Sequence, residues 1–302
     1  MRILVTGRQG QVAGALADLA GARPDELEVA ALGRPELDIT DRASVERAVA
    51  GFSPDIVVNA AAYTAVDKAE TEEDAAFAVN ADGAGNVAAA AAAAGVPVIH
   101  LSTDYVFSGE GDRPWREDDR TGPQGAYGRT KLAGEEAVRA ANPRHAILRT
   151  SWVYAPFGHN FARTMLRLAG DRDVVRVVAD QHGAPTYAPD IAGGILAVAK
   201  VALAEPDSAR WRGTFHMTAA DETTWAGFAE AVFSASAARG GPSARVEPIA
   251  TADYPTPARR PANSRLDNSR FRATFAHALP DWRDGVERCV AELVRPSSNM
   301  VR

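Results

Sequence analysis

Short runs rich in valine, isoleucine and leucine alternate with helical patterns over the first 150 residues, and no other feature constrains the fold as strongly. Strands are expected at residues 2–7, 28–32, 55–61, 97–103 and 145–151. Helices are expected at residues 11–21, 40–51, 72–95 and 127–141, the second of them capped by Thr40 or Asp41. Because apolar strands joined by helices pair in parallel with right-handed crossovers, the pattern predicts a doubly wound α/β sheet.

The pattern loosens after about residue 150, where proline and glycine interrupt "YAPFGHN", "QHGAPTYAPD" and "YPTPARRPANS". A smaller, loop-rich α/β lobe that faces the sheet is typical of such a composition. We therefore expect residues 1–150 to form the sheet domain. Residues 151–302 are expected to form mostly a second, substrate-binding lobe, with some segments returning to the first domain.

The segment "VTGRQGQVAGAL" follows the first strand and opens the first helix. Gly7 and Gly10 stand where a tight turn lets a pyrophosphate approach backbone N–H groups at a helix N-terminus, and Ala13 takes the place of a third glycine. Glycines also mark ordinary turns, but a strand before and a helix after favour a dinucleotide site. The first domain is thus predicted to be an NAD(P)-binding Rossmann domain.

The end of the second strand predicts which dinucleotide is bound. An acidic residue there is the usual partner of the NAD ribose, but this chain has Gly33 and Arg34, with Arg8 in the glycine loop. Two guanidiniums favour the 2′-phosphate of NADPH, with NADH possible, unless both are merely solvated. The expected cofactor-binding residues are Gly7, Gly10, Gln11, Val12, Arg34, Asp38, Ile39, Ala60, Ala61, Ala62, Tyr63, Thr64, Ser102, Tyr127 and Lys131.

A tyrosine and a lysine four positions apart, Tyr127 and Lys131, open a predicted helix and share one face of it. Only three of the 33 lysines and arginines are lysines, which suggests that a compact ammonium is needed at Lys131. Thr103 closes the fourth strand at the same edge of the sheet. Packing, solvation and strand-end capping are the structural alternatives for these three residues.

Thr103, Tyr127 and Lys131 resemble the active-site triad of the extended short-chain dehydrogenase/reductase superfamily. The ammonium and an oxidised nicotinamide would lower the pKa of the phenol, ordinarily about 10. Tyr127 is then expected to give a proton to a carbonyl oxygen that Thr103 hydrogen-bonds, while Lys131 also holds the nicotinamide ribose.

Six segments, "VNAAAYTAVDKAE", "HLSTDYVFSG", "YGRTKLAGE", "RTSWVYAPFGHNF", "VVADQHGAPT" and "YPTPARRPANSRLD", closely resemble the dTDP-4-dehydrorhamnose reductase family. They follow the family's order along nearly the whole chain. The resemblance implies reduction of the C4 ketone of dTDP-4-dehydro-β-L-rhamnose to dTDP-L-rhamnose. It also implies that Asp104, Tyr105 and Trp152 line the sugar pocket with Thr103, and that the loop carrying Arg260 meets the nucleotide diphosphate. Trp152 as a core residue and Arg260 as part of a solvated turn remain open alternatives.

Some relatives form a dimer bridged by magnesium and held by glutamates. The corresponding places in this chain are Ala15 and Pro189, which cannot ligate a hard cation, so no metal site is expected. A monomer and a homodimer both remain possible.

Three alternative functions stay open. The first is a reductase of another dTDP-4-keto-deoxyhexulose in secondary metabolism. The second is a nucleotide-sugar dehydratase or epimerase, which the absence of a glutamate after Thr103-Asp104 disfavours. The third is a non-catalytic NADP-binding regulatory subunit, which the intact triad disfavours.

Composition narrows the partners and the compartment. A formal net charge of −6 argues against nucleic acid or an anionic membrane as partner. The single cysteine, Cys289, fits a reducing compartment, and the segment "MRILVTG" lacks the features of a signal peptide. A cytoplasmic protein is therefore expected.

Overall fold

The computed structural model describes residues 1–294. Its core is a six-stranded parallel sheet with the order β10-β5-β4-β3-β1-β2. The strands are β1 (Arg2–Thr6), β2 (Glu28–Leu32), β3 (Ile56–Asn59), β4 (Val98–Thr103), β5 (His145–Thr150) and β10 (Gly213–His216). The predicted doubly wound α/β fold is thus confirmed, and each of the five expected strands is present with ends shifted by two residues at most.

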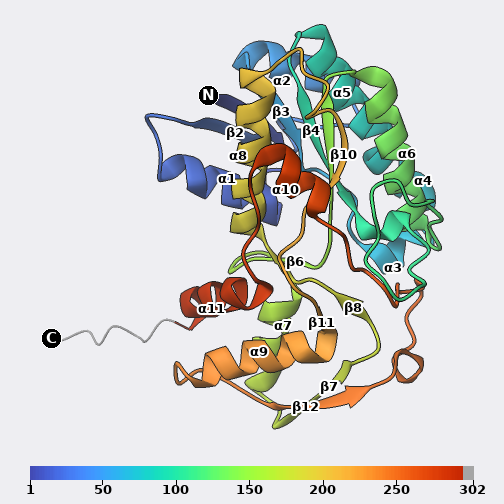
Figure 1. Ribbon diagram of the computed structural model, residues 1–302, viewed down its shortest axis with the longest axis vertical. Helices are drawn as coiled ribbons and strands as arrows, with labels where there is room; N and C mark the ends of the chain where they lie inside the picture. Colours follow the sequence, from blue (N-terminus) through green and yellow to red (C-terminus); the bar gives the residue numbers. More distant parts are fainter. Residues whose placement is uncertain (295–302) are drawn as a thin grey trace, which may run out of the picture.

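Helices cover both faces of the sheet (Figure 1). On one face, α1 (Gln11–Gly21) and α8 (Ala188–Ala204) pack on Ile3 and Val5 of β1, together with α10 (Ser269–Phe275). On the other face, α2 (Arg42–Phe52) and α5 (Gly83–Ala93) pack on Leu4 and Val57, joined by Val138 of α6 (Ala126–Ala141). Alternate residues of β1 therefore enter opposite cores, as the period of a strand requires.

The helix expected at residues 72–95 is interrupted. It consists of α4 (Glu73–Phe77), a π-helical turn (Ala78–Asp82) and α5. Asn80 lies in this turn, and its side chain accepts from the Tyr63 backbone N–H at 2.8 Å and donates to the Thr130 hydroxyl at 3.0 Å. Such turns are frequent at functional sites. Hydrophobic periodicity could not reveal this one, because the apolar pattern continues through it.

A short helix, α3 (Val66–Ala69), follows the third strand and was not expected. Capping of the second helix follows the prediction: Asp41 accepts the Ala43 backbone N–H at 3.0 Å, and α2 begins at Arg42.

A second layer of elements lies below the sheet in Figure 1. It holds three helices, α7 (Phe161–Ala169), α9 (Trp225–Ala237) and α11 (Trp282–Leu293). Three pairs of short strands accompany them. These are β6 (Val153–Tyr154) with β9 (Thr186–Tyr187), β7 (Val174–Val178) with β12 (Arg245–Ile249), and β8 (His182–Gly183) with β11 (Thr223–Thr224). A separate apolar core unites α7, α9 and α11 with β7 and β12.

Three elements beyond residue 150, α8, β10 and α10, belong to the sheet layer. Within residues 1–294, no helix combines the length and the apolar character needed to cross a bilayer.

Candidate functional site

A cavity of about 330 Å³ opens at the switch point of the sheet, between β1 and β3. The connection after β1 leads to β2 on one side, and the connection after β3 leads to β4 on the opposite side. The carboxyl ends of β1, β2 and β3 border it, which is where open α/β sheets bind ligands. Many of the predicted cofactor residues line it: Gly7, Gly10, Arg34, Asp38, Ile39, Ala60, Ala61, Ala62 and Thr64.

The glycine loop is shaped for a close backbone approach. Gly7 has φ +94°, and a Cβ there would stand 3.0 Å from the Cα of Ala61. Gly10 donates its N–H to the Gly7 carbonyl at 2.8 Å and caps α1 without a side chain. The first backbone N–H groups of α1, which have no intrahelical acceptor, are thereby left open to an anion.

Two arginines supply positive charge at the rim of the cavity, and only one of them is held in an ion pair by the residues that the structure describes. Arg8 pairs with Glu36 at 3.1 Å and donates to the Arg34 carbonyl at 3.4 Å. Arg34 lines the cavity, is exposed, and forms no ion pair within residues 1–294. Thr40 holds the pKa of Asp38 below its ordinary value by hydrogen bonding. The rim thus offers one free guanidinium and one that an acid already holds.

Two predicted cofactor residues lie at the start of α1, outside the cavity lining. The Gln11 side chain accepts from Asn160 at 2.9 Å, so it ties the glycine loop to the second layer. Val12 is buried in the core. Their backbone N–H groups belong to the first turn of α1, where they have no intrahelical acceptor.

Two further predicted cofactor residues have side chains already engaged elsewhere. The Tyr63 hydroxyl donates to Glu72 at 2.5 Å. The Ser102 hydroxyl donates to buried Glu135 at 2.7 Å. Neither residue lines the cavity, and their role in cofactor binding stays a prediction.

Thr103 ends β4 and starts a 3₁₀ turn formed by Asp104–Val106. Its hydroxyl accepts the Tyr105 backbone N–H at 3.2 Å and donates to Asp104 Oδ1 at 3.0 Å. Thr103 and Asp104 are both buried, and Asp104 Oδ2 has no partner within residues 1–294. An orphaned buried carboxylate oxygen is costly, so this oxygen is a candidate acceptor for a ligand hydroxyl.

Burial raises the pKa of Asp104 to about 6, while the hydroxyls of Ser264 and Thr103 oppose the rise. The charged carboxylate is therefore a source of strain in the folded protein at neutral pH.

Asp104→Asn is expected to stabilise the protein by about 2–3 kcal/mol near pH 8. The raised pKa of Asp104 means that the fold binds its proton more tightly than the unfolded chain does, so the wild type gains stability as pH falls from about 8 to about 4. The asparagine oxygen still accepts from Thr103 and carries no charge, so the advantage of the variant shrinks over the same range. Urea unfolding at both pH values measures this, and an equal difference at the two would contradict it.

Tyr127 enters α6 one residue after its start and stands edge-on to Tyr105, with ring centroids 5.4 Å apart. Burial, followed by the charge of Asp104, raises the pKa of the Tyr127 phenol, and the nearby Thr103 hydroxyl opposes this. For the chain without a cofactor, the expected lowering of this pKa is wrong in direction. The cause is desolvation, which outweighs the neighbouring groups.

Lys131 lies one turn further along α6 and is 2% exposed. Its ammonium donates to the Leu101 carbonyl of β4 at 2.7 Å. Burial lowers the pKa of Lys131 to about 8, and the charge of Glu135 works against that fall. The ammonium is thus anchored to the strand that carries Thr103.

A buried polar network that the sequence did not predict lies one further turn along α6. Glu135 is fully buried and binds Arg149 of β5 through two hydrogen bonds of 2.7 Å. Arg139 also donates to it at 2.7 Å. These partners hold the pKa of Glu135 below its ordinary value despite burial. The only sequence signal was the spacing of four residues after Lys131.

The predicted diphosphate residue, Arg260, is held next to the site by a second missed residue. Arg260 donates to Asp67 of α3 at 2.6 Å, and Asp67 also accepts the Ala258 backbone N–H at 3.2 Å. Burial raises the pKa of Tyr105 to about 12, and the nearby guanidinium of Arg260 opposes this rise. One carboxylate therefore ties the loop around residues 258–260 to the edge of the sheet.

Trp152 follows β5 with φ +50°, an unusual backbone conformation for a bulky residue. Its ring stacks on Trp225 with centroids 3.8 Å apart and an interplanar angle of 15°. A Cβ on Gly183 would stand 2.7 Å from the Trp152 ring. The indole is half-buried, so packing partners fix it while part of its surface stays accessible.

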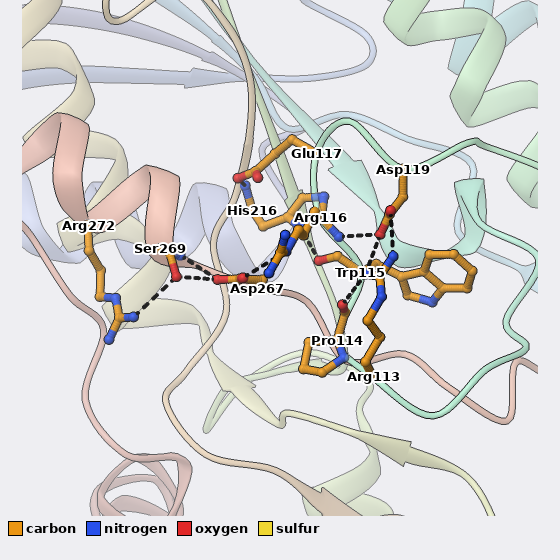
Figure 2. A network of polar contacts seen from close by, with 10 residues as sticks. All are labelled: Arg113, Pro114, Trp115, Arg116, Glu117, Asp119, His216, Asp267, Ser269 and Arg272. Atoms are coloured by element: carbon orange, nitrogen blue, oxygen red, sulfur yellow. Dashed lines mark hydrogen bonds and ion pairs between the residues drawn. The ribbon is translucent and has the colours of Figure 1, made fainter.

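The loop between Thr103 and Tyr127 is anchored at its middle by the polar contacts drawn in Figure 2. Arg113 pairs with Asp119 at 2.7 Å, which closes the loop on itself. Glu117 accepts the His216 backbone N–H at 2.9 Å, and His216 Nδ1 lies 3.0 Å from the Trp115 carbonyl. The loop is thereby fastened to β10.

A second set of contacts in Figure 2 fastens the same loop to α10. Arg116 lies 3.7 Å from Asp267, which accepts from Ser269 at the start of α10. The Trp115 ring stacks on Phe107 with centroids 4.7 Å apart. The path of the loop that leads to Tyr127 is thus fixed by contacts with residues far along the chain.

Of the two positions at which no metal ligand was expected, Ala15 is buried on α1, and Pro189 lies in the first turn of α8. Within residues 1–294, no cluster of three or more histidines, cysteines or acids is arranged to hold a metal ion. Independence from a metal remains a prediction.

A doubly wound parallel sheet with a glycine loop at its switch point, and with a Tyr-x-x-x-Lys helix at the same edge, defines an extended short-chain dehydrogenase/reductase. Comparison with known proteins narrows this class. A family model described as the RmlD substrate binding domain matches residues 1–295. The chain belongs to this family, that of the dTDP-4-dehydrorhamnose reductases.

Relatives of known name and solved structures are similar to this chain over most of its length. A dTDP-4-dehydrorhamnose reductase of Sinorhizobium fredii is 52% identical over 97% of this chain and 98% of its own. The Escherichia coli K12 enzyme of the same name is 48% identical over 85% of each. A dTDP-4-dehydrorhamnose reductase of Bacillus anthracis, solved in complex with NADP, superposes with a TM-score of 0.88 at 34% identity, covering 96% of this chain and 99% of that one.

Proposed function

We propose that this protein reduces the C4 ketone of dTDP-4-dehydro-β-L-rhamnose to dTDP-L-rhamnose with NADPH, the last step in making that nucleotide sugar. The observation that carries the proposal is the meeting of Thr103, Asp104 and Tyr127 beside a glycine-loop cavity at the carboxyl edge of the sheet. The names of relatives at 45–52% identity support the choice of substrate.

The residues present fit a dinucleotide. A backbone cradle that a Cβ at Gly7 would fill, open N–H groups at the start of α1, and the free Arg34 suit a diphosphate and a 2′-phosphate. NADPH supplies the hydride that reduces the ketone. Lys131, whose ammonium is anchored to Leu101, is placed to hold a ribose hydroxyl as well.

Tyr127 is the proton donor in this proposal. Its raised pKa keeps the phenol neutral and therefore able to donate a proton to the ketone oxygen as that oxygen becomes an alkoxide. Thr103 donates a hydrogen bond to the same oxygen by exchanging its bond to Asp104. Asp104 Oδ2, which is unpartnered, accepts from a sugar hydroxyl.

The nucleotide sugar is assigned to the boundary between the two layers. Arg260 faces the diphosphate, with Asp67 fixing its direction, and Trp152 walls the sugar. In this view residues 1–150, with α8, β10 and α10, form the cofactor domain, and most of residues 151–302 form the substrate lobe. A cytoplasmic monomer or homodimer that needs neither nucleic acid nor membrane completes the proposal.

The test is turnover of the purified protein with dTDP-4-dehydrorhamnose, followed by loss of NADPH absorbance and identification of the product by NMR. Formation of dTDP-L-rhamnose supports the proposal. Faster reduction of another dTDP-4-keto-deoxyhexulose would move the assignment to that sugar. Binding of NADPH without reduction of any such sugar would leave a non-catalytic binding protein.

Arg34→Ala is expected to raise the KM for NADPH about tenfold and to leave the KM for NADH unchanged. A hydrogen bond to a charged group is worth about 1.5–3 kcal/mol, and only NADPH carries the 2′-phosphate. Arg8→Ala is the matched control, with a smaller effect because Glu36 already holds that guanidinium. Steady-state kinetics with both cofactors measures this, and equal changes for NADH and NADPH would rule out the assignment.

A further inference from the structure

The face of α6 that carries Tyr127 and Lys131 continues into the core as Glu135, at intervals of four residues. Its carboxylate accepts four hydrogen bonds of 2.7 Å. Oε1 receives Ser102 Oγ and Arg149 Nε, and Oε2 receives one guanidinium nitrogen each from Arg149 and Arg139. A buried carboxylate with this many donors stays ionised.

Its partners connect Glu135 to the reacting end of β4. Ser102, which Glu135 holds, stands between Leu101, whose carbonyl binds the Lys131 ammonium, and Thr103. A shift of Ser102 would therefore move both neighbours. The same carboxylate thus controls the position of two groups that the proposed reaction uses.

Its charge matters as much as its bonds. Burial alone disfavours a charged Lys131, and Glu135 is the group that opposes this. The other charged or titratable groups around this face of α6 come from several elements. They are His100 of β4, Asp104 in the turn after it, Arg149 of β5, Arg139 on α6 itself, Glu70 just after α3, and Glu73 of α4.

Among these groups, two are cations bound to Glu135, and His100 is kept neutral because burial and the charge of Lys131 hold its pKa well below the ordinary value. Glu70 accepts the Ala126 backbone N–H, and Glu73 pairs with Arg129 at the exposed side. Removing the charge of Glu135 would leave Lys131 in a buried region where Arg139 and Arg149 are cationic.

We propose that Glu135 is a positioning residue for the reduction: a permanently ionised buried carboxylate that keeps Lys131 protonated and fixes the Leu101–Thr103 segment. The proposal rests on the proposed reductase function for its catalytic meaning. Its electrostatic part concerns the free protein alone and can be tested without any substrate.

The chain has only three lysines, so the titration of Lys131 can be followed directly. The protein is labelled with ¹³C,¹⁵N-lysine, the Lys131 signal is assigned with Lys131→Met, and its side-chain shifts are recorded against pH. The wild type is expected to titrate near pH 8. Glu135→Gln is expected to titrate about one pH unit lower. Ser102→Ala, which keeps the carboxylate, is the matched control and is expected to leave the midpoint unchanged.

Glu135→Gln leaves a buried guanidinium short of its partner and can fail to fold. The paired variant Glu135→Gln with Arg149→Met removes one charge of each sign, and its Lys131 midpoint is compared with that of Arg149→Met alone, so that only the charge of Glu135 differs. A Lys131 midpoint that is the same in Glu135→Gln as in wild type, or the same in the pair as in Arg149→Met, would overturn the proposal.

The catalytic part of the proposal is tested by the pH dependence of kcat/KM. In Glu135→Gln the alkaline limb of the kcat/KM profile is expected to move to lower pH together with the Lys131 midpoint. A purely structural role would lower activity equally at every pH and would contradict the proposal. If the wild type reduces no dTDP-sugar, the proposed function fails while the NMR result still decides the role of Glu135.

Discussion

Tyr127→Phe is expected to lower kcat by about 10²–10⁴-fold, the usual contribution of a positioned general acid. The ring keeps its edge-on contact with Tyr105 and its place in the small core with Ala126, so packing and folding are retained. What is lost is the only phenol hydroxyl on this face of α6, and with it the proton for the ketone oxygen. Steady-state loss of NADPH absorbance at saturating sugar measures kcat.

The control for this variant is binding. The dissociation constant for NADPH, from fluorescence titration, is expected to stay at the wild-type value, as is the midpoint of thermal unfolding. A variant whose kcat stays within about tenfold of wild type would show that another group or a water supplies the proton. The proposed role of Tyr127 would then fail, whereas the fold and the family would stand.

Arg149→Met is expected to destabilise the protein by about 3–5 kcal/mol, because it leaves Glu135 buried without its bidentate partner. Arg149 is 3% exposed and also lies over the Phe107 ring, 4.9 Å from the ring centroid. Urea unfolding at pH 7 measures the loss. The pKa of Glu135 is lowered in the folded state, so the wild-type advantage is present at neutral pH and disappears as pH falls through that lowered value.

The comparison that isolates the charge is the paired variant of Arg149→Met with Glu135→Gln. Removing both charges avoids a lone buried ion, so the pair is expected to be more stable than Arg149→Met alone. Additive losses in the two single variants and the pair would show that packing of the arginine stem, and not the ion pair, carries the stability.

Local patterns were sufficient for five of the six strands of the sheet and for much of the cofactor cavity. The short edge strand β10 was not predicted. The five predicted strands are recognisable from their apolar runs. Gly7 and Gly10 lie at a strand-to-helix junction, whose geometry depends on residues that are close in sequence. The side-chain commitments of Ser102 and Tyr63 were missed, because their partners Glu135 and Glu72 are recognisable only once the helices are packed.

The groups that sequence analysis missed are joined across long stretches of chain. Asp67 and Arg260 are 193 positions apart, and nothing near either of them predicts the pair. The direction of the pKa shift of Tyr127 was also out of reach, since spacing reveals a neighbouring ammonium but not how much water the fold removes. Periodicity finds elements, whereas desolvation and long-range pairing are properties of the assembled fold.

The anchoring of the loop between Thr103 and Tyr127 has a consequence for biosynthesis. Its fastening points, His216 and Asp267, leave the ribosome long after both of these residues have been synthesised. A nascent chain can therefore pair its first five strands early and still lack a finished reaction centre. Because the chain is translated from its N-terminus, the contacts that position this loop form only after Asp267 has been synthesised.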